Sequence, residues 1–134
     1  MQILLFDTGI WIDYLRGQET SKVNLLDEYL LNTDVLRICP PIIQEILQGI
    51  RQDEQFNKIQ KNLDRLSCLQ IDAKEAAFGA AELYRNLRKE GITIRKPNDC
   101  LIAFYAIHFD ISLVHNDSDF DLMIDHSPLK IYQL

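Results

Sequence analysis

Cysteine is scarce in this sequence, and its three copies, Cys39, Cys68 and Cys100, are far apart and form no CxxC pair. An odd number of widely spaced cysteines supports neither a disulfide framework nor a zinc site, so we expect all three to be buried core residues. Long apolar runs are also absent, since none approaches the roughly 18 residues of a membrane span. The amino terminus, MQILLFD, has neither the basic region nor the cleavage motif of a signal peptide. We therefore expect a cytoplasmic protein without a membrane segment.

Glycine and proline are few, with five and four copies among 134 residues, and there is no repeat, low-complexity tract or flexible linker. A content of 47% apolar and 25% charged residues is typical of an ordinary globular domain. The length predicts one domain spanning residues 1–134. The motifs GxxxxGK(S/T), GxGxxG and GxSxG are missing. Their absence disfavours nucleoside triphosphate binding, dinucleotide binding and serine-hydrolase chemistry.

Positive charge is in the minority, because 14 Lys and Arg residues face 20 Asp and Glu residues for a net charge of −6. This balance argues against a nucleic-acid partner, since phosphate contacts need cations. However, metal ions held in an acidic crevice can engage phosphate, and a local basic rim can coexist with an acidic total. The net charge alone therefore does not exclude a nucleic-acid substrate.

Short apolar runs alternate with helical patterns along the whole chain. The runs at residues 3–6, 35–39, 69–71 and 111–114 predict buried strands, and residues 129–134 predict a last edge strand. Helical spacing predicts helices at residues 10–16, from 21, at 42–50, around 56–66, at 73–89 and from 98. The apolar face of the segment 73–89 favours sheet-covering core or a self-association surface; it consists of Ala76, Phe78, Ala80, Leu83 and Leu87. This alternation predicts an α/β fold with a mainly parallel sheet.

Four acidic residues, Asp7, Glu45, Asp99 and Asp117, lie where an apolar run meets a turn or the start of a helix. Because the carboxyl ends of parallel strands meet in one crevice, we expect these side chains to converge. Clustered carboxylates favour Mg²⁺ or Mn²⁺, hard cations that can activate water for phosphodiester hydrolysis. Each acid taken alone is better explained as a helix N-cap or turn residue. Their shared placement favours a metal site, with Glu45 reaching the ion directly or through water.

Other polar residues near these acids are placed to support them. Asp119 can complete the carboxylate cage from its loop, and the Thr8 hydroxyl can bind the scissile phosphate or a water. Arg95 and Lys96 can hold RNA phosphates, although a solvated loop is an equally good interpretation. His115 shows no metal-ligand spacing, so a structural or partner-contact role is favoured for it.

Four segments, LLFDTGIWIDYLRG, PIIQEILQGIR, IRKPNDCLIAFYAI and LVHNDSDFDLM, resemble in order and spacing the motifs of PIN-domain ribonucleases, specifically the small VapC-like toxins of toxin–antitoxin pairs. The resemblance spans nearly the whole chain. It implies an α/β/α sandwich and Mg²⁺- or Mn²⁺-dependent endonucleolytic cleavage of RNA. By this resemblance the family's acidic quartet corresponds to Asp7, Glu45, Asp99 and Asp117, with Asp119 as a supporting acid.

The resemblance also implies partners. Family members are usually homodimers, and an antitoxin inhibits them by laying its carboxyl-terminal segment over the active-site groove, often with a basic side chain near the acids. Their substrates include tRNAs and ribosomal RNA, and these residues do not select between them.

The sequence departs from the family pattern at Gly9, where many relatives carry Asn or Ser. We expect metal binding to remain despite this change. We expect either Glu45 or Asp117 to orient the nucleophilic water, and the division of roles among the four acids stays open.

Two other functions remain as alternatives. The first is a non-catalytic PIN-like module that binds RNA or a protein; the intact quartet argues against it, because a binder has no need of clustered acids. The second is a phosphotransfer receiver or phosphatase on a similar sheet, which needs a nucleophilic Asp and a Lys on a later strand. Lys130 is a poor candidate for that lysine, because it lies in the terminal segment.

Overall fold

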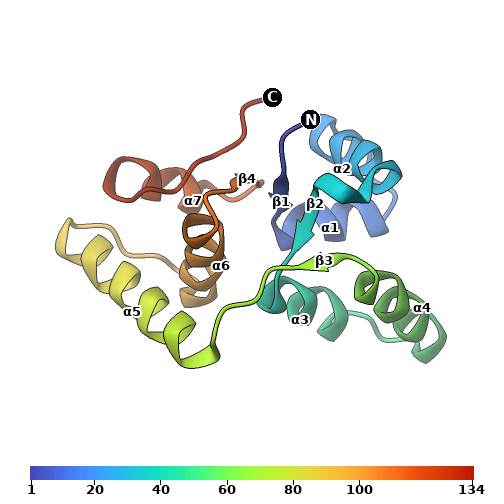
Figure 1. The fold of residues 1–134 in the computed structure, drawn as a ribbon, viewed down its shortest axis with the longest axis horizontal. Coiled ribbons are helices and arrows are strands. Elements are labelled where there is room, and N and C mark those ends of the chain that lie inside the picture. Colours follow the sequence, from blue (N-terminus) through green and yellow to red (C-terminus); the bar gives the residue numbers. More distant parts are fainter.

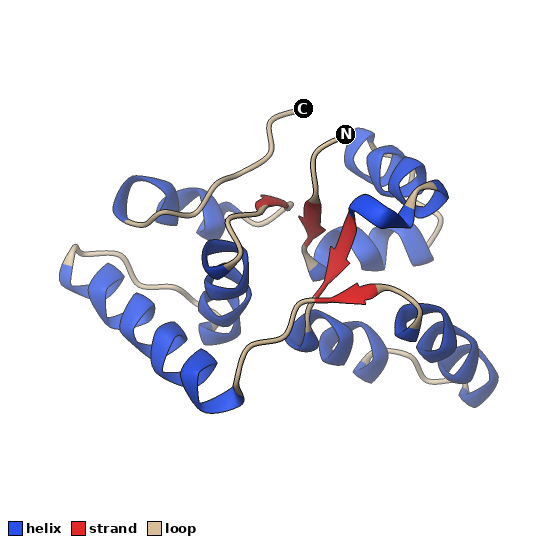
Figure 2. Cartoon of the chain, in the orientation of Figure 1, coloured by secondary structure: helices blue, strands red, loops and turns tan.

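A parallel four-stranded sheet forms the centre of the fold (Figure 1). In the computed structural model, which describes residues 1–134, the strands are β1 (Leu4–Phe6), β2 (Leu36–Ile38), β3 (Ser67–Cys68) and β4 (Ser112–Val114). Their order is β3-β2-β1-β4, and every pair is parallel. Helices flank the sheet on both sides (Figure 2). The expected α/β/α sandwich with a mainly parallel sheet is confirmed.

The central strand β1 is buried on both faces. Its residues Leu4, Leu5 and Phe6 have no exposed surface, which is typical of a parallel strand covered by helices. Phe6 pairs with Val114 of β4, and the backbone N–H of Asp7 donates to the Val114 carbonyl at 2.9 Å. The two strands therefore end together, and the residues that follow them share one edge of the sheet.

Seven α-helices and two short 3-10 helices connect the strands. They are α1 (Thr8–Leu15), α2 (Ser21–Leu31), η1 (Thr33–Val35), α3 (Pro40–Gln48), α4 (Asp53–Asp64), α5 (Ala73–Lys89), α6 (Pro97–His108), α7 (Ser118–Met123) and η2 (Ile124–His126). In Figure 1, α2 and α4 lie to the right of the sheet, and α5, α6 and α7 lie to its left. None of the helices combines the length and apolarity needed to cross a bilayer.

Two helices begin earlier than their sequence patterns predicted. The helix expected at residues 10–16 begins at Thr8, directly after Asp7. The helix expected at residues 42–50 begins at Pro40. Proline suits a first helical position, because the N–H that it lacks has no partner there. The earlier starts place both helices at the edge where the strands end.

Two predicted strands differ from the structure. The prediction of a strand at residues 69–71 is wrong by two positions, since β3 ends at Cys68. Because β2 ends before a pair of prolines, only two of its residues pair with β3. Leu69 adds one last N–H bond to the β2 carbonyl of Ile38, at 2.7 Å. The edge strand expected at residues 129–134 reduces to a single parallel bridge at Ile131.

Helix α5 packs on α6, which lies between it and the sheet (Figure 1). Its Ala76 and Leu87 are buried, whereas Phe78 is 67% exposed. The face therefore joins the core at Ala76 and Leu87, but it packs on α6 and not on the sheet; its alternative role as a self-association surface stays a prediction. The two helices approach closely at Gly79, where an added Cβ would lie 2.2 Å from ring atoms of Phe104 on α6.

We predict that Gly79→Ala lowers the free energy of unfolding by about 1 kcal/mol, measured by urea denaturation. The added methyl overlaps the Phe104 ring, and overpacking of this kind outweighs the gain of alanine in helix propensity. Gly49→Ala is the control, because its Cβ would meet nothing closer than 3.6 Å; it should change stability by less than about 0.5 kcal/mol. A Gly79→Ala protein as stable as the parent would show that α5 and α6 do not approach this closely.

Candidate active site

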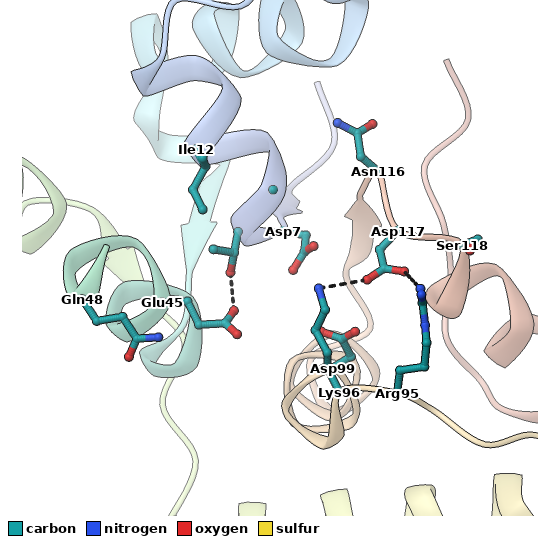
Figure 3. Close-up of a pocket in the computed structure, with 12 residues that line it drawn as sticks. Asp7, Ile12, Glu45, Gln48, Arg95, Lys96, Asp99, Asn116, Asp117 and Ser118 are labelled. Carbon is teal, nitrogen blue, oxygen red and sulfur yellow. Dashed lines mark hydrogen bonds and ion pairs between the residues drawn. The ribbon is translucent and has the colours of Figure 1, made fainter. Parts of the chain in front are cut away.

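A cleft of about 620 Å³ opens at the carboxyl edge of the sheet (Figure 3). Its walls are polar, with Ile12 as the single apolar residue among twelve. The lining includes the four acids expected to converge, Asp7, Glu45, Asp99 and Asp117. The other lining residues are Thr8, Gly9, Gln48, Arg95, Lys96, Asn116 and Ser118. The structure thus brings carboxylates from four distant segments into one cavity.

Each acid is carried by a helix that begins at this edge. Asp7 is the N-cap residue of α1, directly after β1, and Asp117 is the N-cap residue of α7. Asp99 lies in the first turn of α6. Glu45 is further along α3 and points into the cleft from the opposite side to Asp99 (Figure 3). Helix amino termini favour negative charge, which helps the fold to hold these side chains together.

Asp7 and Asp99 are the two buried acids of the quartet, with 7% and 4% of their surface exposed. Asp7 Oδ1 and Asp99 Oδ2 are buried and have no hydrogen-bond partner. Burial raises the pKa of Asp7 to about 6, with smaller increases from the charges of Glu45 and Asp117. Burial, together with the charges of Asp7 and Asp117, raises the pKa of Asp99 to about 7. The backbone N–H groups of Thr8 and Gly9 offset only part of the increase at Asp7, and the charge of Lys96 offsets only part of the increase at Asp99.

Thr8 and Glu45 form a hydrogen-bonded pair on the α3 side of the cleft. The Thr8 hydroxyl donates to Glu45 Oε1 at 2.5 Å (Figure 3). Thr8 is buried and Glu45 is half-buried, so the bond holds the longer carboxylate against the start of α1. In the structure Thr8 contacts Glu45, and its expected contact with a phosphate or a water stays a prediction.

Arg95 and Lys96 lie on the opposite side of the cleft and pair with Asp117 (Figure 3). Arg95 Nη2 is 3.6 Å from Asp117 Oδ1, and Lys96 Nζ is 3.5 Å from Asp117 Oδ2. Burial alone would raise the pKa of Asp117, but the backbone N–H of Asp119 and the two cations outweigh it and lower the pKa. The cation side chains are 71% and 65% exposed. Such exposed pairs are weak and exchange readily for other anions.

Asp119 points toward Arg95 and does not line the cleft. Its Oδ2 accepts from the Arg95 backbone N–H at 3.2 Å and from Arg95 Nε at 3.3 Å. One oxygen from each of Asp99, Asp117 and Asp119 nevertheless lies within 4.8 Å of the others. Asp119 therefore ties the loop before α6 to α7 and remains close enough to support the other acids.

The donor set of the cleft fits a hard divalent cation. All its carboxylates are oxygen donors of the kind that Mg²⁺ and Mn²⁺ prefer. The unpartnered oxygens of Asp7 and Asp99 are the strongest observation, because a buried carboxylate oxygen without a donor is costly and a cation removes that cost. Asp7 and Asp99 could therefore hold an ion, with Asp117 and Asp119 close to Asp99 and Glu45 on the opposite side of the cleft.

Some residues of the site carried no signal in the sequence. Gln48, Asn116 and Ser118 line the cleft but belong to no recognised spacing of polar residues. His115 is buried, and its ring contacts Asp121, an acid outside the set predicted from the sequence. Its position after β4 was the one available clue, because it follows a strand directly and precedes Asp117.

Residues 4–124 match the sequence profile of the PIN domain, so the chain belongs to the PIN-domain family. This confirms the resemblance drawn from the four motifs. Among its relatives, ribonuclease VapC11 of Mycobacterium tuberculosis is 36% identical over 124 residues, which cover 90% of this chain and 91% of that protein. VapC ribonuclease Mb1587 of Mycobacterium bovis has the same identity and coverage. The chain is thus a VapC-like PIN domain.

Solved structures agree with this assignment. VapBC2 from Rickettsia felis, bound to a DNA fragment from its promoter, superposes with a TM-score of 0.75 at 26% identity and covers 99% of both chains. The DNA-bound VapBC structure from Salmonella typhimurium superposes with a TM-score of 0.74 at 20% identity and covers 98% of both chains. At that identity the second likeness supports the fold alone.

We predict that Asp99→Asn stabilises the metal-free protein at about pH 8 and has a much smaller effect at about pH 5. The folded-state pKa of Asp99 is raised from 3.8 to about 7, so the stability contributed by the protonated carboxyl is full below pH 3.8 and is lost as the pH rises through about 7. Each pKa unit corresponds to about 1.4 kcal/mol, and asparagine removes this penalty.

The measurement is the melting temperature in the presence of EDTA at both pH values. Asp125→Asn, the same change at an exposed acid outside the cleft, should leave the melting temperature nearly unchanged at each pH. An equal effect of Asp99→Asn at both pH values would contradict the raised pKa.

Proposed function

We propose that this chain is a Mg²⁺- or Mn²⁺-dependent endoribonuclease and the toxin component of a VapBC-type toxin–antitoxin pair. The observation that carries the proposal is the cleft in which Asp7, Glu45, Asp99 and Asp117 meet, with two buried carboxylate oxygens that no protein group satisfies. The 36% identity to proteins named VapC ribonucleases supports RNA as the substrate.

In this proposal Asp7, Asp99 and Asp117 hold the metal, Glu45 acts directly or through water, and Asp119 is a supporting acid. A bound divalent ion would make a nearby water more acidic and offset the charge that builds on the phosphoryl oxygens. Because the ligands come from the ends of separate rigid elements, their positions are fixed before RNA arrives. This preorganisation favours in-line attack on one phosphodiester.

Thr8 and Glu45 would orient the attacking water. The Thr8 hydroxyl occupies Glu45 Oε1, so the second carboxylate oxygen of Glu45 is free to accept a hydrogen bond from that water. Asp117 is the alternative, since its carboxylate also lines the cleft, but two cations already contact it. Glu45 is therefore the favoured orienting group.

Arg95 and Lys96 would hold RNA phosphates beside the metal site. Both side chains line the cleft and are largely exposed, so an incoming phosphate can reach them. Asp117, which both cations contact in the structure, would bind the metal instead. Both cations would then be free to contact RNA. A basic rim of this kind accounts for RNA binding by a chain whose net charge is −6.

The proposed partners are RNA, a cognate antitoxin and a second copy of the chain, all in the cytoplasm. The Rickettsia felis relative with a TM-score of 0.75 is a VapBC2 assembly, which supports an antitoxin partner here. An acidic cleft suits an inhibitory segment that carries a basic side chain. Both tRNA and ribosomal RNA remain candidate substrates.

We predict that the purified protein cleaves RNA with Mg²⁺ or Mn²⁺, does not cleave it with EDTA, and loses cleavage in Asp99→Asn while remaining folded. The substitution removes a carboxylate charge from the proposed metal site. End-labelled tRNA and ribosomal RNA, resolved on gels, provide the assay. Asp125→Asn, purified in the same way, should cleave normally and excludes a contaminating nuclease.

Full activity in Asp99→Asn would overturn the catalytic assignment. RNA that binds but is not cut by the parent protein under any metal condition would instead favour a non-catalytic PIN-like binding module. The two results are distinct, because the first retains cleavage and the second never shows it.

We predict that Lys96→Met weakens RNA binding and lowers the slope of log Kd against log salt concentration by about 0.7, because one phosphate contact to a single strand is lost. Fluorescence anisotropy in an Asp7→Asn background measures binding without cleavage. Lys58→Met makes the same charge change at an exposed position of α4 outside the cleft. Equal slopes for both variants would show that Lys96 contacts no phosphate.

A further inference from the structure

The loop between β4 and α7 carries Asp117 into the cleft, and two side chains fix its backbone. His115 Nδ1 accepts a hydrogen bond from the backbone N–H of Asp117 at 3.0 Å. Asp117 Oδ1 in turn accepts from the backbone N–H of Asp119 at 3.0 Å. In each bond a backbone N–H donates to the side chain two residues before it, which is the arrangement of an Asx-turn. The loop therefore consists of two consecutive turns, and a histidine closes the first.

The second nitrogen of His115 is also engaged. Nε2 lies 3.0 Å from Asp121 Oδ1. A backbone N–H can only donate, so Nδ1 must carry the lone pair and the proton of the neutral ring must be on Nε2, where Asp121 accepts it. The Phe120 ring packs against the imidazole, with centroids 5.2 Å apart, and His115 is only 5% exposed. Asp121 thus selects the tautomer that lets Nδ1 accept from Asp117.

Two further contacts anchor the loop to the helices beside it. Lys22 Nζ, from the first turn of α2, donates to the His115 carbonyl at 2.5 Å. Asn116 Nδ2 donates to Asp13 Oδ2 of α1 at 3.2 Å. The loop is therefore held at the His115 carbonyl, the His115 imidazole and the Asn116 side-chain amide. The groups that hold it, Lys22, Asp121 and Asp13, lie outside the cleft lining.

We propose that His115 is a positioning residue for Asp117: its imidazole, oriented by Asp121, fixes the backbone at Asp117 and so directs that carboxylate into the cleft. This inference rests on the proposed function, in which Asp117 is a metal ligand. Neither His115 nor Asp121 lines the cleft, so their effect on the site is transmitted through the loop. Outer partners of this kind typically contribute 10- to 100-fold to metal affinity.

A purely structural role would also bury a ring beside Phe120, and the choice of substitution separates the two. His115→Leu keeps apolar bulk but removes the acceptor for the Asp117 N–H. His115→Asn gives up bulk but supplies an oxygen that can accept from the N–H two residues later. If the ring serves packing alone, His115→Leu should keep more of the Mn²⁺ affinity than His115→Asn. If the ring positions Asp117, His115→Asn should keep more of it.

The test is Mn²⁺ binding by isothermal titration calorimetry, with the melting temperature of each metal-free variant recorded in parallel. His115→Leu should bind Mn²⁺ about 10- to 100-fold more weakly than the parent, and His115→Asn should recover most of the lost affinity. His126→Asn, at a histidine outside the cleft, is the control and should bind like the parent. Undiminished binding by a folded His115→Leu protein would overturn the proposal.

A second measurement holds even if His115→Leu does not fold. Long-range ¹⁵N–¹H correlation spectra of the parent protein without metal report the His115 tautomer directly, and the proton should be on Nε2. In Asp121→Ala, an exposed substitution, a mixture with Nδ1–H and about 10-fold weaker Mn²⁺ binding are expected, whereas Asp121→Asn should retain the Nε2–H tautomer. An Nδ1–H tautomer in the parent would overturn the proposal. If the parent shows the expected tautomer but does not bind Mn²⁺, the result would instead overturn the proposed function on which this inference rests.

Discussion

Negative charge at the carboxyl edge of the sheet, only partly neutralised by the protein itself, is the constraint on which the rest of the structure depends. Asp7 follows β1, and the pairing of β1 with β4 brings it to the edge where the loop to Asp117 begins. Asp99 reaches the same edge from the first turn of α6. Burial of Asp7 and Asp99 costs stability, which the fully buried strand residues around them offset. The architecture thus holds in place an arrangement that like charges would otherwise disperse.

The charge is divided unequally among the acids of the cleft. Asp7 and Asp99 each have an unpartnered oxygen, whereas Asp117 contacts two exposed cations. The unpartnered oxygens need a cation that the protein does not supply, which is the basis for the proposed metal site. Arg95 and Lys96 can change partner, which is the basis for the proposed phosphate contacts. One cavity therefore accounts for both parts of the proposed function.

The sequence predicted most of what depends on local pattern and parallel topology. The runs before Asp7 and Asp117 identified β1 and β4, and the shared end of parallel strands predicted their convergence. Contacts that depend on packing between distant segments were not predictable. Helix α5 packs on α6 and leaves Phe78 exposed, and Asp119 faces Arg95 through a contact across 24 residues. Likewise, nothing in the spacing of His115 and Asp121 shows that their side chains meet.

The central claim, that the unpartnered carboxylates hold a divalent cation, is tested most directly by anomalous X-ray diffraction from crystals soaked in Mn²⁺. The account predicts a strong manganese peak inside the cleft, at ligand distance of about 2.2 Å from oxygens of both Asp7 and Asp99. Asp117 should approach the same ion, and the Lys96 ammonium should have moved away from the carboxylates. A cleft without a manganese peak at saturating Mn²⁺, or a peak bound only to exposed acids elsewhere on the surface, would contradict it.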